Sequence, residues 1–312
     1  MTGDPRQVAS AIRSEVSRFV VGKGEAIDIL LAAIVAEGHV LLEGPPGAAK
    51  TTLAKVFARS MGGEFRRLQF TPDLLPADVV GTKVFNQKDG TFSTRQGPIF
   101  ANVILADELN RATPRTQSAM LEAMQEDQVT IEGETLKLPR PFVTIATQVP
   151  YGSPGTYPLT EVQLDRFAVK VSMGYSSMEE EKSIMSKIDS LDALEVRRQA
   201  QAEDVLSLIR AAKSIVVSER VTDYIARIVS NLRSDANVRV PPSTRASIWL
   251  YKMGRARALL DGRSYVLPDD VKALAGYVLS HRLILTPDAE TEDLKPSKLI
   301  ESAVAATPVP VE

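Results

Sequence analysis

The sequence contains no cysteine and only two histidines, His39 and His281. Without cysteine, the chain can form no disulfide framework, no thiol nucleophile and no cysteine-ligated metal site. Two histidines are too few for a histidine-rich metal site, and each lies beside a predicted strand or helix. We therefore expect both histidines to be structural, and the composition excludes metal sites built from histidine and cysteine.

Long apolar runs and an excess of charge of one sign are also missing. The most apolar stretch, residues 27–36, contains Asp28 and ends at Glu37-Gly38, so it is too short to span a bilayer. The first residues carry no apolar signal core. The formal net charge is -2 and the sequence pI is about 5.9, so no general basic field attracts nucleic acid or anionic membrane. We predict a cytoplasmic protein without membrane insertion.

The 312 residues include 44% hydrophobic side chains, which is sufficient for a sizeable core. This length predicts two domains, or one large and one small domain. Apolar strand patterns alternate with helical patterns up to about residue 173, whereas residues from 178 onward show helical spacing without strong strands. We predict an α/β core with a parallel sheet over residues 1–174, followed by a helical lid domain with a C-terminal tail over residues 175–312.

The stretch from Gly44 to Thr52 reads Gly-Pro-Pro-Gly-Ala-Ala-Lys-Thr-Thr and lies between an apolar run and a helical pattern. A strand, a glycine-containing loop and a helix in this order are the context of a phosphate-binding P-loop. Backbone N–H groups of such a loop bind phosphate, Lys50 reaches the β- and γ-phosphates, and the Thr51 hydroxyl binds Mg²⁺. The usual pattern has glycine before the lysine, where this chain has Ala49. We predict nucleotide binding here.

A pair of acids, Asp107-Glu108, ends a later apolar strand. Ligands bind at the carboxyl ends of parallel strands, so the pair is expected beside the P-loop. Asp107 can hold the Mg²⁺ shell, and Glu108 can polarise a water for attack on the γ-phosphate. Such a pair alone is usually a solvated turn, but after a P-loop it predicts a Walker B element.

Hydrolysis also needs cations that offset charge on the γ-phosphate. Arg166 lies just before the last predicted strand, and Arg245 opens a predicted lid helix. Either arginine alone would usually be read as part of a surface ion pair. An arginine that completes the site can come from the same chain or from a neighbouring copy.

Long motifs follow one another in order along the chain, at residues 44–51, 70–78, 97–102, 106–114, 116–126, 155–159 and 164–167. With these motifs the chain resembles the MoxR family of AAA+ ATPases from about residue 20 to about residue 287. The resemblance implies an AAA+ P-loop NTPase core with a helix-2 insertion at residues 71–97. It also implies a hairpin before sensor 1 at residues 128–138 and a smaller all-α lid domain.

The resemblance also implies ATP or ADP with Mg²⁺ as ligands, and a role for each matching residue. Arg166 matches the arginine finger, which acts on nucleotide held by the neighbouring subunit, and Arg245 matches sensor 2, which contacts phosphate from the lid. Glu108 is the catalytic carboxylate of Walker B, which polarises the attacking water, and Thr51 and Asp107 bind the metal. The nucleotide-binding residues are Val21 and Gly22 at the adenine, and Gly44, Pro46, Gly47, Ala48, Ala49, Lys50, Thr51 and Thr52 in Walker A. The family tolerates alanine before the P-loop lysine.

One departure from the family concerns sensor 1, where the strand usually ends in Ala-Thr-Gln-Asn-Pro. Here residues 146–150 read Ala-Thr-Gln-Val-Pro, and Val149 cannot hydrogen-bond a water or the γ-phosphate. Gln148 is adjacent, but successive residues of a strand point to opposite faces. The Thr147 side chain could shift and take the place of the missing polar side chain at the sensor 1 position. We predict slow hydrolysis with nucleotide binding largely intact.

The resemblance implies an ATPase with a chaperone-like role, which remodels or activates protein clients as a homo-oligomeric ring, most often a hexamer. It also implies a partner with a von Willebrand factor A domain. One alternative is the motor subunit of a metal chelatase, which shares the helix-2 insertion. A second alternative, a nucleic-acid motor, would carry basic residues on a hairpin whose tip here is Glu132-Gly133-Glu134, so we expect no nucleic-acid partner. A third alternative, supported by Val149, is a scaffold that is switched by nucleotide binding and barely hydrolyses ATP.

Overall fold

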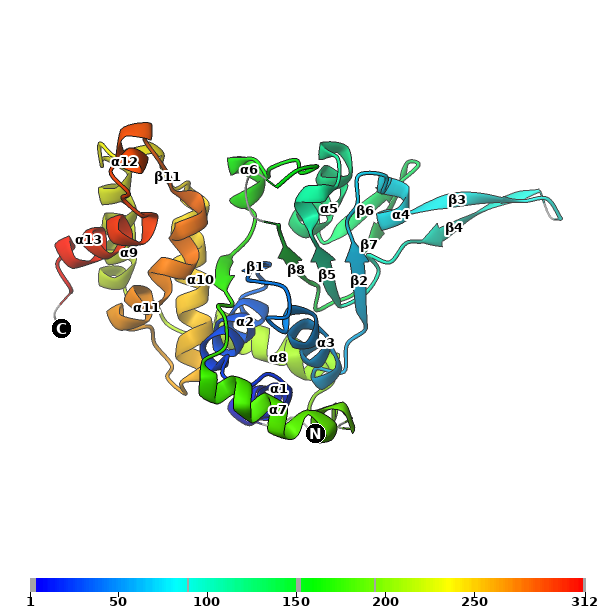
Figure 1. The fold of residues 1–312 in the computed structure, drawn as a ribbon, viewed down its shortest axis with the longest axis horizontal. Helices are drawn as coiled ribbons and strands as arrows, with labels where there is room; N and C mark the ends of the chain where they lie inside the picture. The colour runs from blue at the N-terminus through cyan, green and yellow to red at the C-terminus, as the bar shows by residue number, and fades with distance from the viewer. Residues whose placement is uncertain (1–3, 89, 150–152, 194, 311–312) are drawn as a thin grey trace.

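The computed structural model describes residues 4–88, 90–149, 153–193 and 195–310. Its centre is a five-stranded sheet in the order β2-β5-β8-β1-β9, in which all neighbouring strands are parallel (Figure 1). The strands are β1 (Val40–Glu43), β2 (Phe65–Gln69), β5 (Val103–Asp107), β8 (Val143–Thr147) and β9 (Val169–Ser172). They coincide with the apolar runs that predict strands, so the α/β core with a parallel sheet is confirmed.

Both faces of the sheet are buried, because successive side chains of a strand point to opposite faces. Val40 and Leu42 lie in a buried cluster with helices α1 (Pro5–Phe19), α2 (Gly24–Val35) and α3 (Lys50–Ser60). Leu41, between them, lies in a second cluster with α5 (Pro114–Glu126) and β6 (Gln128–Ile131). With its faces covered, the sheet presents functional groups at its ends, in the loops that follow the strands.

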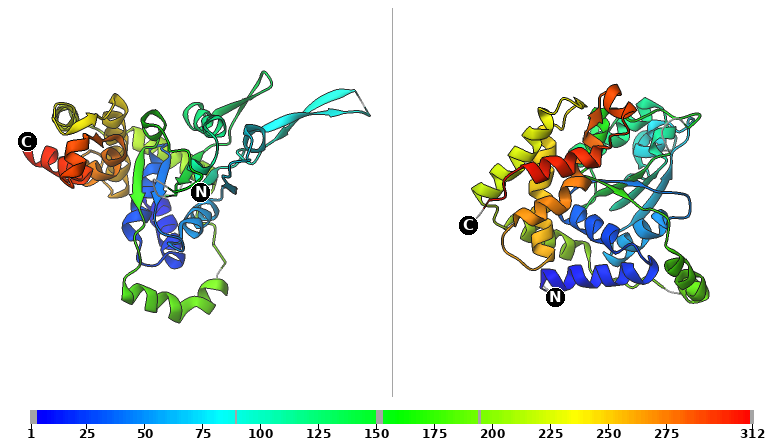
Figure 2. Two further views of the ribbon diagram at one scale, coloured as in Figure 1. Left: turned by 45° about the horizontal axis from the view of Figure 1, so that its top comes forward. Right: turned by 60° about the vertical axis from the view of Figure 1, so that its left-hand side comes forward.

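Two antiparallel hairpins extend from this core. The longer one pairs β3 (Gly81–Asn86) with β4 (Thr91–Gln96), follows the short helix α4 (Pro76–Val80) and projects far from the rest of the molecule (Figures 1 and 2). The shorter one pairs β6 with β7 (Glu134–Lys137). Thr94 Oγ1 donates a hydrogen bond to the Glu134 carboxylate at 2.9 Å, so the two hairpins touch. They occupy the ranges predicted for the helix-2 insertion and for the hairpin before sensor 1.

The C-terminal part is helical, as predicted (Figure 1). Its helices are α8 (Ala202–Lys213), α9 (Glu219–Arg233), α10 (Thr244–Leu260), α11 (Pro268–Leu279), the 3₁₀ turn η2 (Ser280–Arg282), α12 (Pro287–Thr291) and α13 (Pro296–Ala306). Helix α11 and the 3₁₀ turn η2 contact β9. A small antiparallel sheet of β10 (Val238–Val240) and β11 (Ile284–Leu285) joins them. The sequence did not predict these strands, because two or three residues are too few to show alternation.

Helix α7 (Met178–Ala193) follows β9 and stands apart from the other elements (Figure 2). The next helix, α8, packs on α1 and α2, and buried side chains of the lid helices continue the apolar cluster under the sheet. Because one cluster joins both parts, a domain boundary near residue 174 stays a prediction. In the described part of the chain, none of the helices combines the length and the apolar character needed to cross a membrane.

Candidate functional site

The P-loop begins directly after β1 and ends in the first turn of α3. Gly47 has φ +80°, and a Cβ atom there would meet nothing within 4 Å, so the loop is open at this point. No side chain caps α3, which leaves the N–H groups of its first turn for an anion. Lys50 Nζ donates to the carbonyl oxygens of Gly44 at 2.7 Å and Pro45 at 2.9 Å, and the neighbouring Thr51 is exposed. These residues fit a nucleotide phosphate with its metal ion.

Two residues of this region that are not glycine have left-handed backbone conformations. Ala49, the N-cap residue of α3, has φ 59° and ψ 21°. Glu108 has φ 57° and ψ 45°. Such a conformation costs an L-residue about 1–2 kcal/mol and persists where the surrounding structure enforces it, which is common at functional sites.

Asp107 and Glu108 lie at the carboxyl end of β5, on the edge of the sheet that carries the P-loop. Arg67 of β2 donates to Asp107 Oδ2 from Nε at 3.0 Å and from Nη2 at 2.6 Å. Glu108 pairs with Arg111 of η1 (Leu109–Arg111) at 2.7 Å and accepts a hydrogen bond from Gln69 at 3.1 Å. The sequence did not single out these partners, because charged or polar residues at strand ends and turns usually face solvent.

Thr147, the last residue of β8, connects the two acids. Its Oγ1 donates to Asp107 Oδ1 at 2.6 Å and accepts from the Glu108 N–H at 2.8 Å. Val149 is held through its backbone, because its N–H and its carbonyl oxygen both bond to the Asn110 side chain at 3.0 Å. The polar side chain of β8 that contacts the Walker B acids is therefore Thr147, and Val149 adds none.

The Gln148 side chain, directly after β8, contacts the neighbouring strand β1 and not β5. Its Nε2 donates to Glu43 Oε1 at 2.7 Å, at the end of β1. Lys170 Nζ lies 3.3 Å from the other oxygen of Glu43. Gln148 is therefore engaged beside the start of the P-loop and does not contact the Walker B acids.

The turn that contains Val21 and Gly22 joins α1 to α2. Lys23 Nζ, next in the chain, donates to the carbonyl oxygens of Gly174 at 2.9 Å and Tyr175 at 3.2 Å. These carbonyl groups follow the carboxyl end of β9. The turn thus lies on the same edge of the sheet as the P-loop, and its contact with adenine stays a prediction.

Arg166 lies between the short helix α6 (Glu161–Leu164) and β9. Its Nη1 donates to the Leu121 carbonyl oxygen at 2.7 Å, whereas its Nε is buried and has no hydrogen-bond partner among the described residues. A cavity of about 310 Å³ opens beside it, lined mainly by α5. The guanidinium of Arg166 therefore keeps donor capacity that this chain does not use.

Arg245 lies in the first turn of α10, close to the segment that carries Arg166. Its Nη1 is 3.4 Å from Asp165 Oδ2, and its Nη2 is 3.4 Å from Gln125 Oε1. Arg166 and Arg245 both line a cavity of about 450 Å³. Three further cations line the same cavity, namely Arg140, Lys213 and Lys252.

Both arginines lie at the amino edge of the sheet, opposite the P-loop. The carbonyl oxygen of His39, directly before β1, accepts a hydrogen bond from the Ala168 N–H at 2.8 Å, so residues 165–168 adjoin the start of β1. Lys50 lies beyond the other end of this four-residue strand, roughly 13 Å farther at about 3.3 Å per residue, with the P-loop between. One copy therefore does not bring Arg166 or Arg245 to its own P-loop.

Both histidines are buried and bond to main-chain groups, which agrees with a structural role. The His39 ring bonds to the Met124 carbonyl oxygen at 2.6 Å, and burial lowers the pKa of His39 to about 4. The His281 ring bonds to the Phe167 carbonyl oxygen at 3.1 Å. Burial, with the charge of Arg282 beside it, holds the pKa of His281 well below its usual value. Both rings are neutral at neutral pH.

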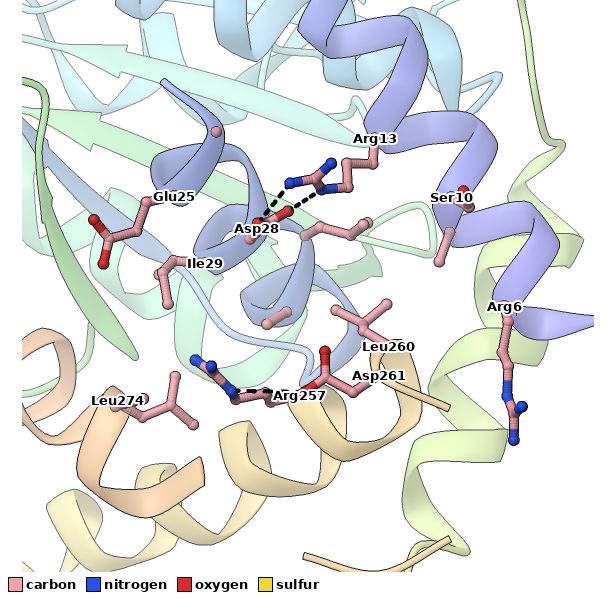
Figure 3. A pocket seen from close by; sticks show the side chains of 15 residues that line it. Arg6, Ser10, Arg13, Glu25, Asp28, Ile29, Arg257, Leu260, Asp261 and Leu274 are labelled. Carbon is pink, nitrogen blue, oxygen red and sulfur yellow. Dashed lines mark hydrogen bonds and ion pairs between the residues drawn. The ribbon is translucent and has the colours of Figure 1, made fainter. Parts of the chain in front are cut away.

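A cavity of about 680 Å³ lies elsewhere, between α1, α2, α10 and α11 (Figure 3). Charged side chains on its rim pair with one another, Arg13 with Asp28 and Arg257 with Asp261 (Figure 3). None of its lining residues belongs to the P-loop or to β5. Cavity size does not identify the functional site here, whereas the chemistry of the P-loop edge does.

Comparison with known families assigns both parts of the chain. Residues 39–169 match the ATPase family associated with various cellular activities (AAA), and residues 230–303 match the AAA lid domain. The first range includes the P-loop, the Walker B acids and Arg166, and the second includes Arg245.

Individual relatives cover nearly the whole chain. It is 43% identical over 298 residues to YeaC of Bacillus subtilis (strain 168), whose function is uncharacterized, covering 95% of this chain and 93% of that protein. It is 40% identical over 305 residues to Chaperone MoxR1 of Mycobacterium tuberculosis, covering 95% and 81% of the two chains. A crystal structure of an inferred ATPase from Cytophaga hutchinsonii superposes with a TM-score of 0.92 at 38% identity, covering 98% and 96%. The chain therefore belongs to the MoxR family of AAA+ ATPases.

Proposed function

We propose that this protein hydrolyses ATP at sites shared by neighbouring copies in a ring, and that hydrolysis drives the remodelling of partner proteins. One observation carries the proposal. Lys50 and Glu108 lie at the carboxyl edge of the sheet, whereas Arg166 and Arg245 lie at the amino edge. Hydrolysis needs cations near the γ-phosphate, so a second copy has to supply these arginines.

One copy contributes the P-loop half of the site. ATP with Mg²⁺ supplies the phosphoryl chemistry when it is bound. Lys50 binds the phosphates, Thr51 and Asp107 hold the metal ion, and Glu108 accepts a proton from the attacking water. Arg67 and Arg111 occupy oxygens of these two carboxylates, so both contacts have to open before Asp107 and Glu108 can act. The other nucleotide contacts we propose are Val21, Gly22, Gly44, Pro46, Gly47, Ala48, Ala49 and Thr52.

The neighbouring copy contributes the arginine half. Arg166 lines two cavities, and the contacts of Arg245 with Asp165 and Gln125 are 3.4 Å long, so we propose that both guanidinium groups offer donors to an anion. The 450 Å³ cavity has further cations in its lining, of which Arg140 and Lys213 pair with Glu37. Arg166 acts as the arginine finger, and Arg245 acts as sensor 2 on the same neighbouring nucleotide.

Hydrolysis is proposed to be slow. Val149 offers no polar side-chain atom to the attacking water or the γ-phosphate. Thr147 does not replace it, because its hydroxyl is engaged with Asp107 and with the Glu108 N–H. The absence of a polar side chain at position 149 is proposed to lower the rate of the chemical step and to leave the P-loop contacts with nucleotide intact.

The β3–β4 hairpin is the element proposed to move against protein clients. Phe85 and Phe92 pack at 5.1 Å between ring centroids, and they are 50% and 68% exposed. Exposed apolar groups on a projecting element favour a protein-binding role. The relative named Chaperone MoxR1 supports a chaperone-like activity for this chain. A hexameric ring and a partner with a von Willebrand factor A domain rest on the resemblance alone.

The alternatives are less well supported. The named relatives are MoxR proteins, which does not favour a chelatase motor. A nucleic-acid motor is disfavoured by the β6–β7 hairpin, whose Glu134 carboxylate lies 3.6 Å from Lys83 and so neutralises a cation of the neighbouring hairpin. The cytoplasmic location stays a prediction from composition, and cell fractionation tests it.

The Glu108→Gln variant tests the proposal. It removes the base and keeps the P-loop, so we expect turnover to fall at least about hundredfold while ATP binding persists. In the presence of ATP, the variant should retain bound proteins in a pulldown, and the Lys50→Ala variant should retain none. Nucleic acid in place of protein would contradict the remodelling role, and background turnover in both wild type and variant would favour a scaffold.

A further inference from the structure

Arg282 belongs to the lid, yet its side chain bonds to the core segment that carries Arg166. The Arg282 side chain is 1% exposed. Its Nε donates to Asp165 Oδ1 at 2.9 Å, its Nη2 to the Asp165 carbonyl oxygen at 3.0 Å, and its Nη1 to the Ala168 carbonyl oxygen at 3.2 Å. Nη2 also donates to the Phe167 carbonyl oxygen. One lid side chain therefore fixes the main chain on both sides of Arg166.

The carboxylate of Asp165 also contacts the start of lid helix α10. Ser243, the N-cap residue of α10, donates from Oγ to Asp165 Oδ2 at 2.8 Å. Arg245, two residues farther along, lies 3.4 Å from the same oxygen. A single carboxylate thus connects η2, α10 and the segment of Arg166.

The contacts of this cluster differ in strength. Burial lowers the pKa of Arg282 to about 10, although the Asp165 charge opposes this, so Arg282 stays charged at neutral pH. Moving its guanidinium would leave buried carbonyl groups and a buried charge unpaired, which is strongly unfavourable. The Arg245 side chain is 42% exposed, and its contacts with Asp165 and Gln125 are both 3.4 Å long. Arg245 is therefore free to leave Asp165, whereas Arg282 is not.

We propose that Arg282 is a positioning residue that, through Asp165, fixes the segment of Arg166 relative to the first turn of helix α10, which carries Arg245. A movement of the lid then carries both arginines together toward the nucleotide of the neighbouring copy. The inference rests on the proposed function and deepens it by naming the contact between the lid and the arginine finger. Arg282 itself has its donors turned to the Asp165 carboxylate and to carbonyl oxygens of its own copy.

The Arg282→Lys variant keeps the charge and loses the forked set of donors. We expect kcat to fall about ten- to hundredfold, because a misplacement of about 1 Å has effects of this size, while the Kd for ATP stays unchanged. The milder Ser243→Ala variant should lower kcat severalfold. Two matched controls should keep the wild-type kcat: Arg263→Lys, whose ion pair with Asp270 (2.7 Å) stays within the lid, and Ser218→Ala at the N-cap of α9.

A mixing experiment separates positioning from general damage. Arg282→Lys keeps an intact P-loop and Lys50→Ala keeps intact arginines, so mixed rings should recover turnover that neither variant has alone. A loss of ATP affinity, an equal fall in kcat in the controls, or no recovery on mixing would overturn the inference. If Arg282→Lys does not fold, the Ser243→Ala variant tests the inference: a severalfold lower kcat supports it, and a wild-type kcat overturns it. Wild-type turnover in an Arg166→Ala variant would instead refute the proposed function itself, which makes the two failures distinguishable.

Discussion

Ala49 bears the local strain of the P-loop, since its left-handed backbone suits glycine. The Ala49→Gly change should raise the free energy of unfolding by about 1 kcal/mol, because relief of the left-handed penalty exceeds the extra entropy of glycine in the unfolded chain. Urea unfolding measures this gain. ATP affinity should stay the same, because the backbone conformation that forms the loop is retained.

The neighbouring Ala48 offers the control, because it is not among the residues with positive φ. Ala48→Gly should lower the stability through the entropy of the unfolded chain alone. Equal effects of the two changes would show that the conformation of Ala49 carries no cost.

Val149 concerns the chemical step. The Val149→Asn change should raise kcat about tenfold, since one hydrogen bond of about 1.4 kcal/mol in the transition state has this effect. The Kd for ATP should not change, because the P-loop is untouched. Steady-state kinetics with a binding measurement tests both. Val149→Ala removes bulk without adding an amide, so an equal rise in that variant, or no rise with asparagine, would remove the missing amide as the cause.

Some of this residue-scale chemistry was visible in the sequence and some was not. Ala49 and Val149 stand out because each departs from a motif of fixed length, where the neighbours specify the backbone. The pair Arg67 and Asp107 does not stand out, because it joins β2 to β5 across 40 positions of sequence. Only the register of the sheet brings these two side chains together.

At the scale of elements, hydrogen bonds of the His39 ring connect β1, β8 and α5. Its Nδ1 accepts a hydrogen bond from the Thr144 N–H of β8 at 3.0 Å, and its Nε2 donates to Met124 at the end of α5 at 2.6 Å. The ring directly precedes β1 and is 5% exposed. This pattern of one donor and one acceptor requires the neutral form of the ring.

Acid should therefore weaken the fold through His39. Its pKa in the folded protein is about 4, below the ordinary 6.5, so the unfolded chain binds more protons at pH values below 6.5. The stability is full above pH 6.5 and is lost as the pH falls toward 4, by roughly 2 kcal/mol at pH 5. Urea unfolding at pH 7 and pH 5 measures the loss.

The His39→Gln variant is the comparison, because it keeps hydrogen-bonding groups and cannot titrate. Its stability should depend less on pH, although part of the dependence remains, since His281 is buried with a lowered pKa of the same sign. An unchanged pH dependence in this variant would contradict the assignment to His39.

The strands and long helices were predictable because each has a local apolar period and a punctuating loop. The place of α10 was not predictable in this way. Residues 242–260 read as a helix, but the sequence does not say that its first turn packs at the amino edge of the sheet. That position depends on contacts with Asp165, about 80 residues earlier, and it decides that Arg245 lies with Arg166 and away from Lys50.

At the scale of the whole molecule, the proposed function gives an isolated copy two half-sites on opposite edges of one sheet. The turnover per copy should therefore fall when the protein is diluted below the concentration at which it assembles. Lys50→Ala and Arg166→Ala should each abolish turnover, the first by preventing ATP binding and the second with ATP binding intact. Their defects lie in different halves of a shared site.

An equal mixture of Lys50→Ala and Arg166→Ala should then regain activity. If copies mix at random, roughly a quarter of the interfaces pair an intact P-loop with intact arginines, so about a quarter of the wild-type turnover is expected. The control is a mixture of Arg166→Ala with Arg245→Ala. Both defects there lie in the arginine half, so no interface is complete and no activity should return. Recovery in this control, or its absence in the first mixture, would contradict a site shared between copies.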